Sequence, residues 1–468
     1  MEIKRREFLW SAGAATLLAG CRVPDVLGTP DLCFGVVSDL HVTTPKSCRL
    51  FESALWQFRR RGVDAVVIPG DLTDWGLRSG YVYVKRAWDK VFAGTDVVPL
   101  FCTGNHDYEG WRYPDMAMEM RANGYSEGEN LAERGMAGEW ASVFGEPFDI
   151  VRCRRVKGYD FVSTECVASA SGELASWLAK NSGRLSRDRP FFYFRHGPIA
   201  GTTVDGLGDP DVETKGILAK FPNCLALTGH MHRPFVDERQ IWQGEFTAIG
   251  VPSLSYACFP GGHENGEGKR DGESRQAMPI IPARRDLRGG QGLVVSVWPE
   301  KIVVERRDME EDEEGAPAWL IPLPLGQASR PYADGVREDA EPVPEFPRDA
   351  ELDVETRNTE NRSGHWTIVL NCEFPSAHMP NGHRVFDYEI RAVPTDGSKP
   401  IVRRFLSPAY PKLAKYEPER QRFWFDASEL PQGGDVLIEV RAFNCFGRGS
   451  SPLVSGVRRG AAGEEFQI

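Results

Sequence analysis

The sequence has 468 residues, of which 41% are hydrophobic and 26% charged, the composition of a soluble globular protein. A chain of this length favours two folded domains. Its 56 Lys and Arg against 67 Asp and Glu give a net charge of −11, which argues against non-specific nucleic-acid binding but not against binding one phosphate in a locally positive pocket.

The N-terminus has the layout of an export signal. The pair Arg5-Arg6 precedes an apolar run at 12–18 that is too short to span a bilayer. The string RRxFL resembles a twin-arginine signal, and the LAGC box ending at Cys21 resembles the site at which bacterial lipoproteins are cleaved and lipidated. The resemblance implies that residues 1–21 direct export of the folded protein, which is then anchored through a lipid on Cys21 to a bacterial membrane, in the periplasm or at the cell surface. A disordered basic tail before a surface helix is the alternative.

Between residues 30 and 310, short apolar runs that resemble buried strands alternate with helical stretches. The strand-like runs lie within 32–41, 64–71, 97–107, 189–198, 223–232, 245–250, 292–298 and 301–307, and the clearest helices within 47–62 and 81–92. This alternation indicates a layered α/β domain.

Five of these runs end in residues with oxygen or imidazole donors. In chain order they are Asp39 and His41, Asp71, Asn105 with His106 and Asp107, His196, and His230 with His232. Ligand sites in open α/β sheets lie outside the carboxyl ends of strands, so these side chains are expected to converge. His230 and His232 are two residues apart, which on a strand places both on one face, and Gly229 lets the backbone approach closely. The pattern predicts a metal site.

In this order, the motifs SDLH, GDLTD, TGNHD, RHGP and GHMH resemble those of the calcineurin-like metallophosphoesterases over about residues 31–310. The resemblance implies a four-layer α/β/β/α sandwich with a dinuclear metal centre. One ion would be held by Asp39, His41 and His232, the other by Asn105, His196 and His230, and Asp71 would bridge the two. Four positive charges against two carboxylates leave a positive site that attracts a phosphate ester.

The chemistry implied by the resemblance is hydrolysis of a phosphate ester by a metal-bridging hydroxide, with Mn, Fe, Zn or Ni as suitable ions. His106 is the predicted catalytic residue that is not a ligand, stabilising the phosphoryl group or protonating the leaving oxygen. Asp107 is predicted to fix the His106 tautomer or raise its pKa, with a helix N-cap as the alternative. Asp74 is predicted to support a ligand by a hydrogen bond.

Substrate choice is expected in the loops that surround this site, at 108–145, 201–211 and 258–290. The first contains Trp111 and Tyr113. Four basic residues of the last loop would reach a second phosphate or a nucleotide, or else are solvated loop positions: His263, Arg284, Arg285 and Arg288.

The composition changes after the α/β domain, predicted at 31–325, to a polar, proline-rich linker at 326–350. Within 351–460, alternating runs predict a smaller all-β sandwich. Its last long run resembles a fibronectin type III strand, with Ala442, Asn444 and Gly447 in matching places, whereas Cys372 and Val436 replace the usual tryptophan and tyrosine. Another immunoglobulin-like sandwich is the alternative, and a spacer, glycan-binding or protein-docking role is expected from the fold alone.

Three functions are consistent with the sequence. A phosphodiesterase is preferred, because the motif set resembles the branch with cyclic-nucleotide and glycerophosphodiester hydrolases. An extracytoplasmic phosphomonoesterase that scavenges phosphate would have the same ligands. An inactive surface protein that binds through the β-sandwich would be expected to lack a ligand, and all seven are present.

Overall fold

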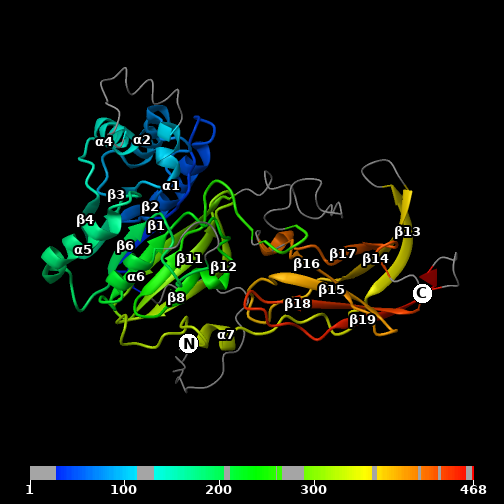
Figure 1. Ribbon diagram of the computed structural model, residues 1–468. Coiled ribbons are helices and arrows are strands. Elements are labelled where there is room, and N and C mark those ends of the chain that lie inside the picture. Colours follow the sequence, from blue (N-terminus) through cyan, green and yellow to red (C-terminus); the bar gives the residue numbers. More distant parts are fainter. Residues whose placement is uncertain are drawn as a thin grey trace, which may run out of the picture.

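The structure is a computed structural model that describes residues 28–112, 131–204, 211–259, 261–265, 289–360, 366–408, 410, 413–430, 434–459 and 466–467. It has a larger α/β body and a smaller all-β body that lie side by side (Figure 1). Within those residues, no helix is both long and apolar enough to cross a membrane.

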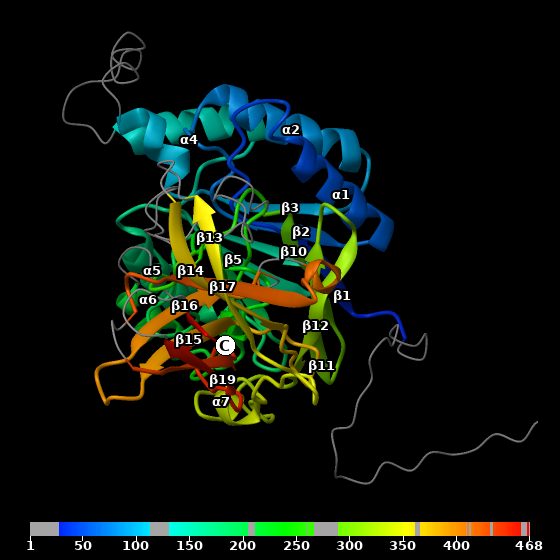
Figure 2. The ribbon, with the colours of Figure 1, turned by 90° about the vertical axis from the view of Figure 1, so that its right-hand side faces the viewer.

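The first sheet of the α/β body has the strand order β12-β11-β10-β1-β2-β3. Its parallel strands are β1 (Leu32–Val36), β2 (Ala65–Pro69) and β3 (Val98–Cys102), and its antiparallel strands are β10 (Gln291–Val297), β11 (Lys301–Asp308) and β12 (Glu313–Pro322). The outer face is covered by helices α1 (Arg49–Arg61), α2 (Arg78–Phe92) and α4 (Leu131–Phe144) (Figure 2). Helix α1 buries Phe51, Leu55 and Phe58 on one face and ends at Gly62, whose φ of 66° is left-handed.

The second sheet has the order β4-β5-β6-β7-β9-β8. Its strands are β4 (Val151–Val156), β5 (Tyr159–Thr164), β6 (Phe191–Arg195), β7 (Cys224–Thr228), β8 (Ile241–Gln243) and β9 (Thr247–Gly250). Helices α5 (Ala170–Asn181) and α6 (Val212–Leu218) pack on its outer face. Strands β5, β6, β7 and β9 are parallel, so their carboxyl ends lie along one edge.

The inner faces of the two sheets form the main core. Phe34 of β1 lies edge-on to Phe161 and Phe192 of the second sheet, with ring centroids 5.2 and 4.9 Å apart. Every residue of β2 and β7 is buried, because each strand has packing on both faces. The arrangement is the predicted four-layer α/β/β/α sandwich, and this prediction is confirmed.

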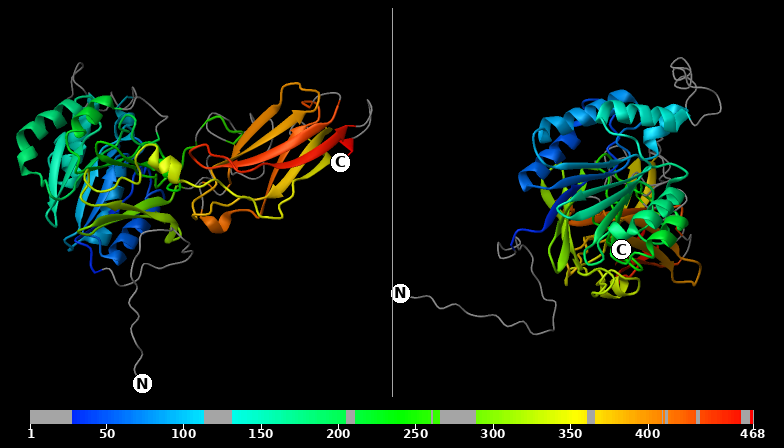
Figure 3. Two further views of the ribbon diagram at one scale, coloured as in Figure 1. Left: turned by 90° about the horizontal axis from the view of Figure 1, so that it is seen from below. Right: turned by 90° about the vertical axis from the view of Figure 1, so that its left-hand side faces the viewer.

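The all-β body is a sandwich of a three-stranded and a five-stranded sheet (Figure 3). The first consists of β13 (Asp353–Glu360), β14 (Trp366–Pro375) and β17 (Arg420–Asp426). The second consists of β15 (Asp387–Pro394), β16 (Ile401–Leu406), β18 (Val436–Phe443), β19 (Leu453–Arg459) and β20 (Phe466–Gln467). Tyr388, Phe405 and Phe423 stack in its core, at centroid distances of 5.3 and 5.7 Å. The prediction of a second, smaller all-β sandwich is confirmed.

The segment predicted as a linker, 326–350, contains α7 (Val336–Ala340) and lies against the second sheet. Trp242 Nε1 donates to Asp334 at 3.0 Å, and Gln243 N donates to the Tyr332 carbonyl at 3.0 Å. The described residues also contain short 3-10 helices, namely η1 (His106–Arg112), η2 (Ser182–Arg184), η3 (Glu238–Gln240) and η5 (Ala414–Tyr416).

Candidate metal centre

Seven side chains meet where strands of both sheets end. Asp39 and His41 follow β1, Asp71 follows β2, Asn105 follows β3, His196 follows β6, and His230 and His232 follow β7. These are the seven predicted ligands, and the structure places them together. Two overlapping groups can be distinguished among them.

The first group joins two carboxylates and two imidazoles. Ligand-type atoms of Asp39, His41, Asp71 and His232 all lie within 4.8 Å of one another, and all four residues are buried. His232 Nε2 is 2.9 Å from Asp39 Oδ1, and His41 Nε2 is 3.6 Å from Asp71 Oδ2. Oxygen and imidazole donors gathered in this way suit a divalent transition metal.

The second group shares Asp71 with the first and adds His196 and His230. His196 Nε2 lies 3.2 Å from both Asp71 Oδ2 and His230 Nδ1. Asn105 joins this group through Oδ1, which is 3.0 Å from His196 Nε2. Because Asp71 belongs to both groups, it is placed to bridge two ions.

The surroundings of two histidines show that the first group fits a cation. His41 Nδ1 lies 2.9 Å from Asp74 Oδ1, and His232 Nδ1 lies 2.9 Å from the Tyr256 carbonyl oxygen, so both Nδ1 atoms face acceptors. The two Nε2 atoms are 3.3 Å apart, and His232 Nε2 is also 2.9 Å from Asp39 Oδ1. With the proton of each neutral ring on Nδ1, these nitrogen and oxygen lone pairs converge on the position that a metal ion would take.

A buried oxygen without a hydrogen bond marks the second group. Asp71 Oδ2 accepts no hydrogen bond from the described residues, although His196 Nε2 lies 3.2 Å away. His196 Nδ1 is 2.9 Å from the Pro69 carbonyl, which leaves Nε2 as a lone pair in the neutral ring. Burial disfavours protonation of His196, but the Asp71 charge outweighs burial and raises its pKa to about 9. A proton and a metal ion therefore compete for one position.

The charges of the other ligands also suit a metal. Burial by itself would raise the carboxyl pKa values of Asp39 and Asp71, but His232 beside Asp39 and His196 beside Asp71 hold both below the usual range. The pKa of His230 falls to about 4 because of burial and the nearby His196. At neutral pH the site thus offers two carboxylates and a neutral His230, the forms that bind metal.

The backbone around the ligands is strained and tightly packed. Left-handed φ values occur at five ligands, namely Asp39 (55°), His41 (46°), Asp71 (50°), His230 (72°) and His232 (51°). Asp and His tolerate this region better than most residues, but it still costs energy, and such strain concentrates at functional sites. Beside these ligands, a Cβ on Gly229 would lie 2.2 Å from Ser38 Oγ and 2.7 Å from the Pro69 carbonyl oxygen. The close approach predicted for Gly229 is present.

His106 lies beside the cluster with 32% of its side chain exposed. Its Nδ1 is 3.2 Å from Asp74 Oδ1, and its ring centroid is 4.5 Å from that of His41. The hydrogen bond with Asp74 outweighs burial and raises the pKa of His106 to about 9. Asp74 therefore orients a predicted ligand and the predicted catalytic residue together.

Asp107 is fully buried, and among the described residues none of its hydrogen bonds reaches the His106 ring. Its carboxylate accepts from the backbone N–H groups of Leu72, Thr73 and Gly104 and from the hydroxyl groups of Thr73 and Tyr81. These bonds fix the loop after β2 against the loop after β3. In the described residues Asp107 thus braces the loops, and Asp74 is the carboxylate that contacts His106; a catalytic role of Asp107 stays a prediction.

The loop residues predicted to bind a second phosphate are only partly described. His263 is buried, and its Nε2 lies 2.7 Å from Asp387 Oδ2 in the all-β body. It therefore contacts a carboxylate rather than a phosphate at the cluster. Outside the described residues lie Arg284, Arg285, Arg288, Tyr113 and the Trp111 side chain.

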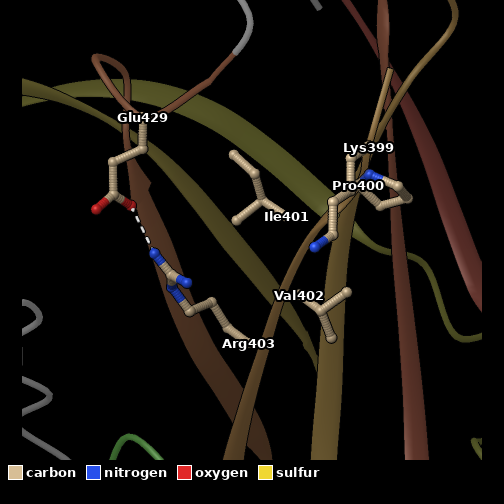
Figure 4. A pocket seen from close by; sticks show the side chains of 6 residues that line it. All are labelled: Lys399, Pro400, Ile401, Val402, Arg403 and Glu429. Carbon is tan, nitrogen blue, oxygen red and sulfur yellow. Dashed lines mark hydrogen bonds and ion pairs between the residues drawn. The ribbon is translucent and has the colours of Figure 1, made fainter. Parts of the chain in front are cut away.

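A hollow of about 570 Å³ lies on the all-β body and includes none of the seven ligands (Figure 4). It is lined by Lys399, Pro400, Ile401, Val402, Arg403 and Glu429. Arg403 and Glu429 form an ion pair across it at 3.2 Å. Its lining contains no imidazole and a single carboxylate, so it lacks the donor set of the Asp/His cluster.

Two groups that orient ligands could not be found in the sequence. The carbonyl oxygens of Pro69 and Tyr256 face His196 Nδ1 and His232 Nδ1, and a backbone acceptor is independent of residue type. The Tyr256 ring also lies against two ligands, with centroids 4.2 Å from His232 and 5.3 Å from His41.

Comparison with known proteins bears directly on this arrangement. The family model described as calcineurin-like phosphoesterase matches residues 33–234, which contain all seven ligands and His106. No curated protein matches the chain.

The solved structures that match the chain have low sequence identity to it and TM-scores below 0.5. The match to GAP50, the anchor in the inner membrane complex of Plasmodium, has 11% identity and a TM-score of 0.36, and covers 65% of this chain and 91% of that one. Purple acid phosphatase PPD1 from yellow lupin has 13% identity and a TM-score of 0.38, over 62% of this chain and 53% of that one. A predicted phosphoesterase from Streptococcus pneumoniae has 11% identity and a TM-score of 0.27, over 62% and 97%. At such low identity, these matches do not identify the activity of this chain.

Proposed function

Because residues 33–234 form a calcineurin-like phosphoesterase domain with an intact Asp/His cluster, we propose that the protein is a metal-dependent phosphodiesterase. The observation that supports this most strongly is the convergence of His41 Nε2, His232 Nε2 and Asp39 Oδ1: the two nitrogen atoms are 3.3 Å apart, and Asp39 Oδ1 is 2.9 Å from His232 Nε2. The complete ligand set also argues against an inactive protein that binds only through its sandwich.

The proposed ligand assignment follows the two groups. One ion would be held by Asp39, His41 and His232, the other by Asn105, His196 and His230, and Asp71 would bridge them. Two divalent ions, such as Mn, Fe, Zn or Ni, would supply Lewis acidity at the phosphoryl group and activate water. With only two carboxylates among the ligands, the loaded site keeps an excess positive charge that favours a phosphate ester.

His106 is proposed to donate a proton to the leaving oxygen or to bind a phosphoryl oxygen. It is partly exposed, its orientation is fixed by Asp74, and its backbone N–H donates to Asp71 at 2.9 Å. A pKa of about 9 keeps the ring protonated at neutral pH, and cations in the cluster would lower that pKa toward the working range of a general acid.

Metal content and activity of the full chain test the proposal together. We expect about two equivalents of metal after reconstitution with Mn²⁺, and faster hydrolysis of bis(p-nitrophenyl) phosphate than of p-nitrophenyl phosphate. His230→Ala should lose part of the metal and nearly all activity. His378→Ala is the matched control, because His378 is an exposed histidine of the all-β body.

The possible results separate the candidate functions. Preference for the monoester would favour a phosphate-scavenging monoesterase with the same ligands. Absence of both metal and hydrolysis after reconstitution with Mn, Fe, Zn and Ni would favour the inactive binding protein.

Two further assignments are proposals from the sequence motifs. Residues 1–21 would be a twin-arginine-type export signal, with lipidation at Cys21, tested by mass spectrometry of the exported protein beside Cys21→Ser. The all-β body would be a fibronectin type III-like module. In its support, Asn444 is fully buried and accepts hydrogen bonds from the backbone N–H groups of Phe446 and Arg448, while Gly447 has a φ of 78°.

A further inference from the structure

The two bodies share a buried interface close to the metal centre. An apolar cluster joins Phe235, Val236, Ala257, Phe259 and Ala316 of the α/β body to Phe386, Leu406 and Tyr410 of the sandwich. Polar groups inside it are paired: the Tyr410 hydroxyl donates to Asp237 at 2.5 Å, and the Arg239 guanidinium lies 4.6 Å from the Phe386 ring centroid. Buried pairs of this kind hold the two bodies in one relative position, because separating the bodies would leave the Asp237 carboxylate without its hydroxyl partner.

One segment of this interface also contacts a predicted metal ligand. We call residues 256–259 and 261–265 the bridging segment. Its Tyr256 carbonyl faces His232 Nδ1 at 2.9 Å, and its Cys258 N–H donates to the His232 carbonyl at 2.8 Å. Arg233, the residue after His232, donates to the Cys258 carbonyl at 3.2 Å. The bridging segment therefore fixes both the backbone and the ring of His232.

The other side of the bridging segment is held by the sandwich. Ala257 and Phe259 belong to the apolar cluster, and His263 Nε2 lies 2.7 Å from Asp387 Oδ2. Two hydrogen bonds join the same segment to the main chain of β16. Glu264 N donates to the Arg404 carbonyl at 2.8 Å, and Leu406 N donates to Asn265 Oδ1 at 2.8 Å. The sandwich thus restrains the segment at several points over a few residues.

The stretch that follows His232 in the chain is held by the same body. Asp237 accepts from Tyr410, and Nε2 of His383 in the sandwich lies 3.6 Å from Oε1 of the neighbouring Glu238. His232 consequently lies between two chain segments that both pack on the interface.

We propose that the C-terminal sandwich is a positioning part of the metal centre, acting through the bridging segment on His232. By holding the Tyr256 carbonyl in place, it orients the His232 ring and directs Nε2 toward the cluster. Groups that hydrogen-bond to metal-binding histidines typically change metal affinity 10–100-fold when they are altered. This role differs from that of a mobile spacer or docking module, and it holds for any substrate.

The experiment compares conservative interface variants in the full chain with a control inside the sandwich core. Tyr410→Phe removes the hydroxyl that binds Asp237, and Asp387→Asn weakens the pair with His263. The control is Tyr388→Phe, a second fully buried tyrosine, whose hydroxyl accepts from Ala377 N at 3.1 Å and belongs to the sandwich core.

Two readouts are needed, and neither depends on turnover. Hydrogen–deuterium exchange of the metal-free protein reports the rigidity of peptides covering 254–265, and Mn²⁺ titration reports the affinity of each ion. For Tyr410→Phe combined with Asp387→Asn we expect faster exchange at 254–265 and weaker binding, by on the order of tenfold, of the ion assigned to Asp39, His41 and His232. The ion assigned to His196 and His230 should keep its affinity, and Tyr388→Phe should change neither readout.

Equal exchange and equal Mn²⁺ affinity in the double variant and the wild type would overturn the proposal and leave the sandwich as a docking or spacer module. The same changes in the Tyr388→Phe control would overturn it as well, since they would reflect general destabilisation. If the double variant does not fold, Tyr410→Phe alone, which lacks a single oxygen atom, decides by the same two readouts. Failure of the phosphodiesterase proposal would appear as missing hydrolysis and would leave the exchange readout intact; Mn²⁺ titration also decides wherever the wild type binds Mn²⁺.

Discussion

Replacing Gly229 by Ala tests how closely the metal centre is packed. The added Cβ would lie 2.2 Å from Ser38 Oγ, 2.7 Å from the Pro69 carbonyl oxygen and 3.0 Å from Asp39 Oδ2. Ser38 Oγ donates to that same carbonyl at 3.1 Å in a buried site, so neither atom can move freely. Overpacking of this kind costs about 1–3 kcal/mol, and part of it would displace Asp39, a predicted ligand.

The expected result for Gly229→Ala is a lower free energy of unfolding in the metal-free protein and weaker binding of the ion assigned to Asp39. Denaturant unfolding and Mn²⁺ titration measure the two effects. The control is Gly216→Ala in helix α6, where a Cβ meets nothing within 4 Å and should leave metal binding unchanged. Adding Ser38→Ala should restore part of the lost stability and metal affinity. It removes the contact of the new Cβ with Ser38 Oγ and leaves the contact with the Pro69 carbonyl oxygen.

A result in which Gly229→Ala binds both ions as tightly as the wild type, at unchanged stability, would refute the reasoning. It would show that the loop after β7 can relax away from the loop after β1, and the steric explanation for glycine in GHMH would be lost.

Three other substitutions separate the roles around the cluster. His106→Asn should lower kcat by about 10²–10⁴-fold while metal content stays the same, as measured by steady-state kinetics and elemental analysis. Asp74→Asn removes the hydrogen bond that raises the pKa of His106, so the alkaline limb of the pH–rate profile should move to lower pH; a limb that stays in place would exclude His106 as the proton donor. Tyr81→Phe removes the hydroxyl that donates to Asp107 at 2.9 Å, and should cost about 1–2 kcal/mol of unfolding free energy in a denaturant titration with little change in Mn²⁺ affinity.

The layered fold and the convergence of the ligands follow from local sequence signals. Strands β2 and β7 are continuous apolar runs, and the polar residues after them lie where parallel strands end. Strand β4 (VRCRRV) is not among the predicted strands, because three of its residues are exposed and its arginines pair with carboxylates that lie outside the strand. Arg152, for example, pairs with Glu146 and Glu165.

The parts of the site that sequence could not supply depend on contacts between distant segments. Asp107 is next to His106 in the TGNHD motif, whereas Asp74 belongs to the separate GDLTD motif, and only the packing shows that Asp74 contacts the ring while Asp107 faces Tyr81. His263 carries a charge that suits a phosphate, and its partner Asp387 is more than a hundred residues away. No local pattern encodes such a pairing, since it arises when two folded bodies meet.

The geometry of the predicted ligands implies that the site is held in place by its surroundings. Left-handed backbone costs on the order of 1 kcal/mol at each residue, and five ligands adopt it. His41 Nε2 and His232 Nε2 are also held 3.3 Å apart beside the Asp39 carboxylate. A chain free to relax would relieve both, so other contacts must oppose relaxation: Asp107 between the loops after β2 and β3, and the bridging segment beside His232. The sandwich is the body that restrains the bridging segment, and a binding-competent His232 therefore depends on residues outside the matched phosphoesterase domain.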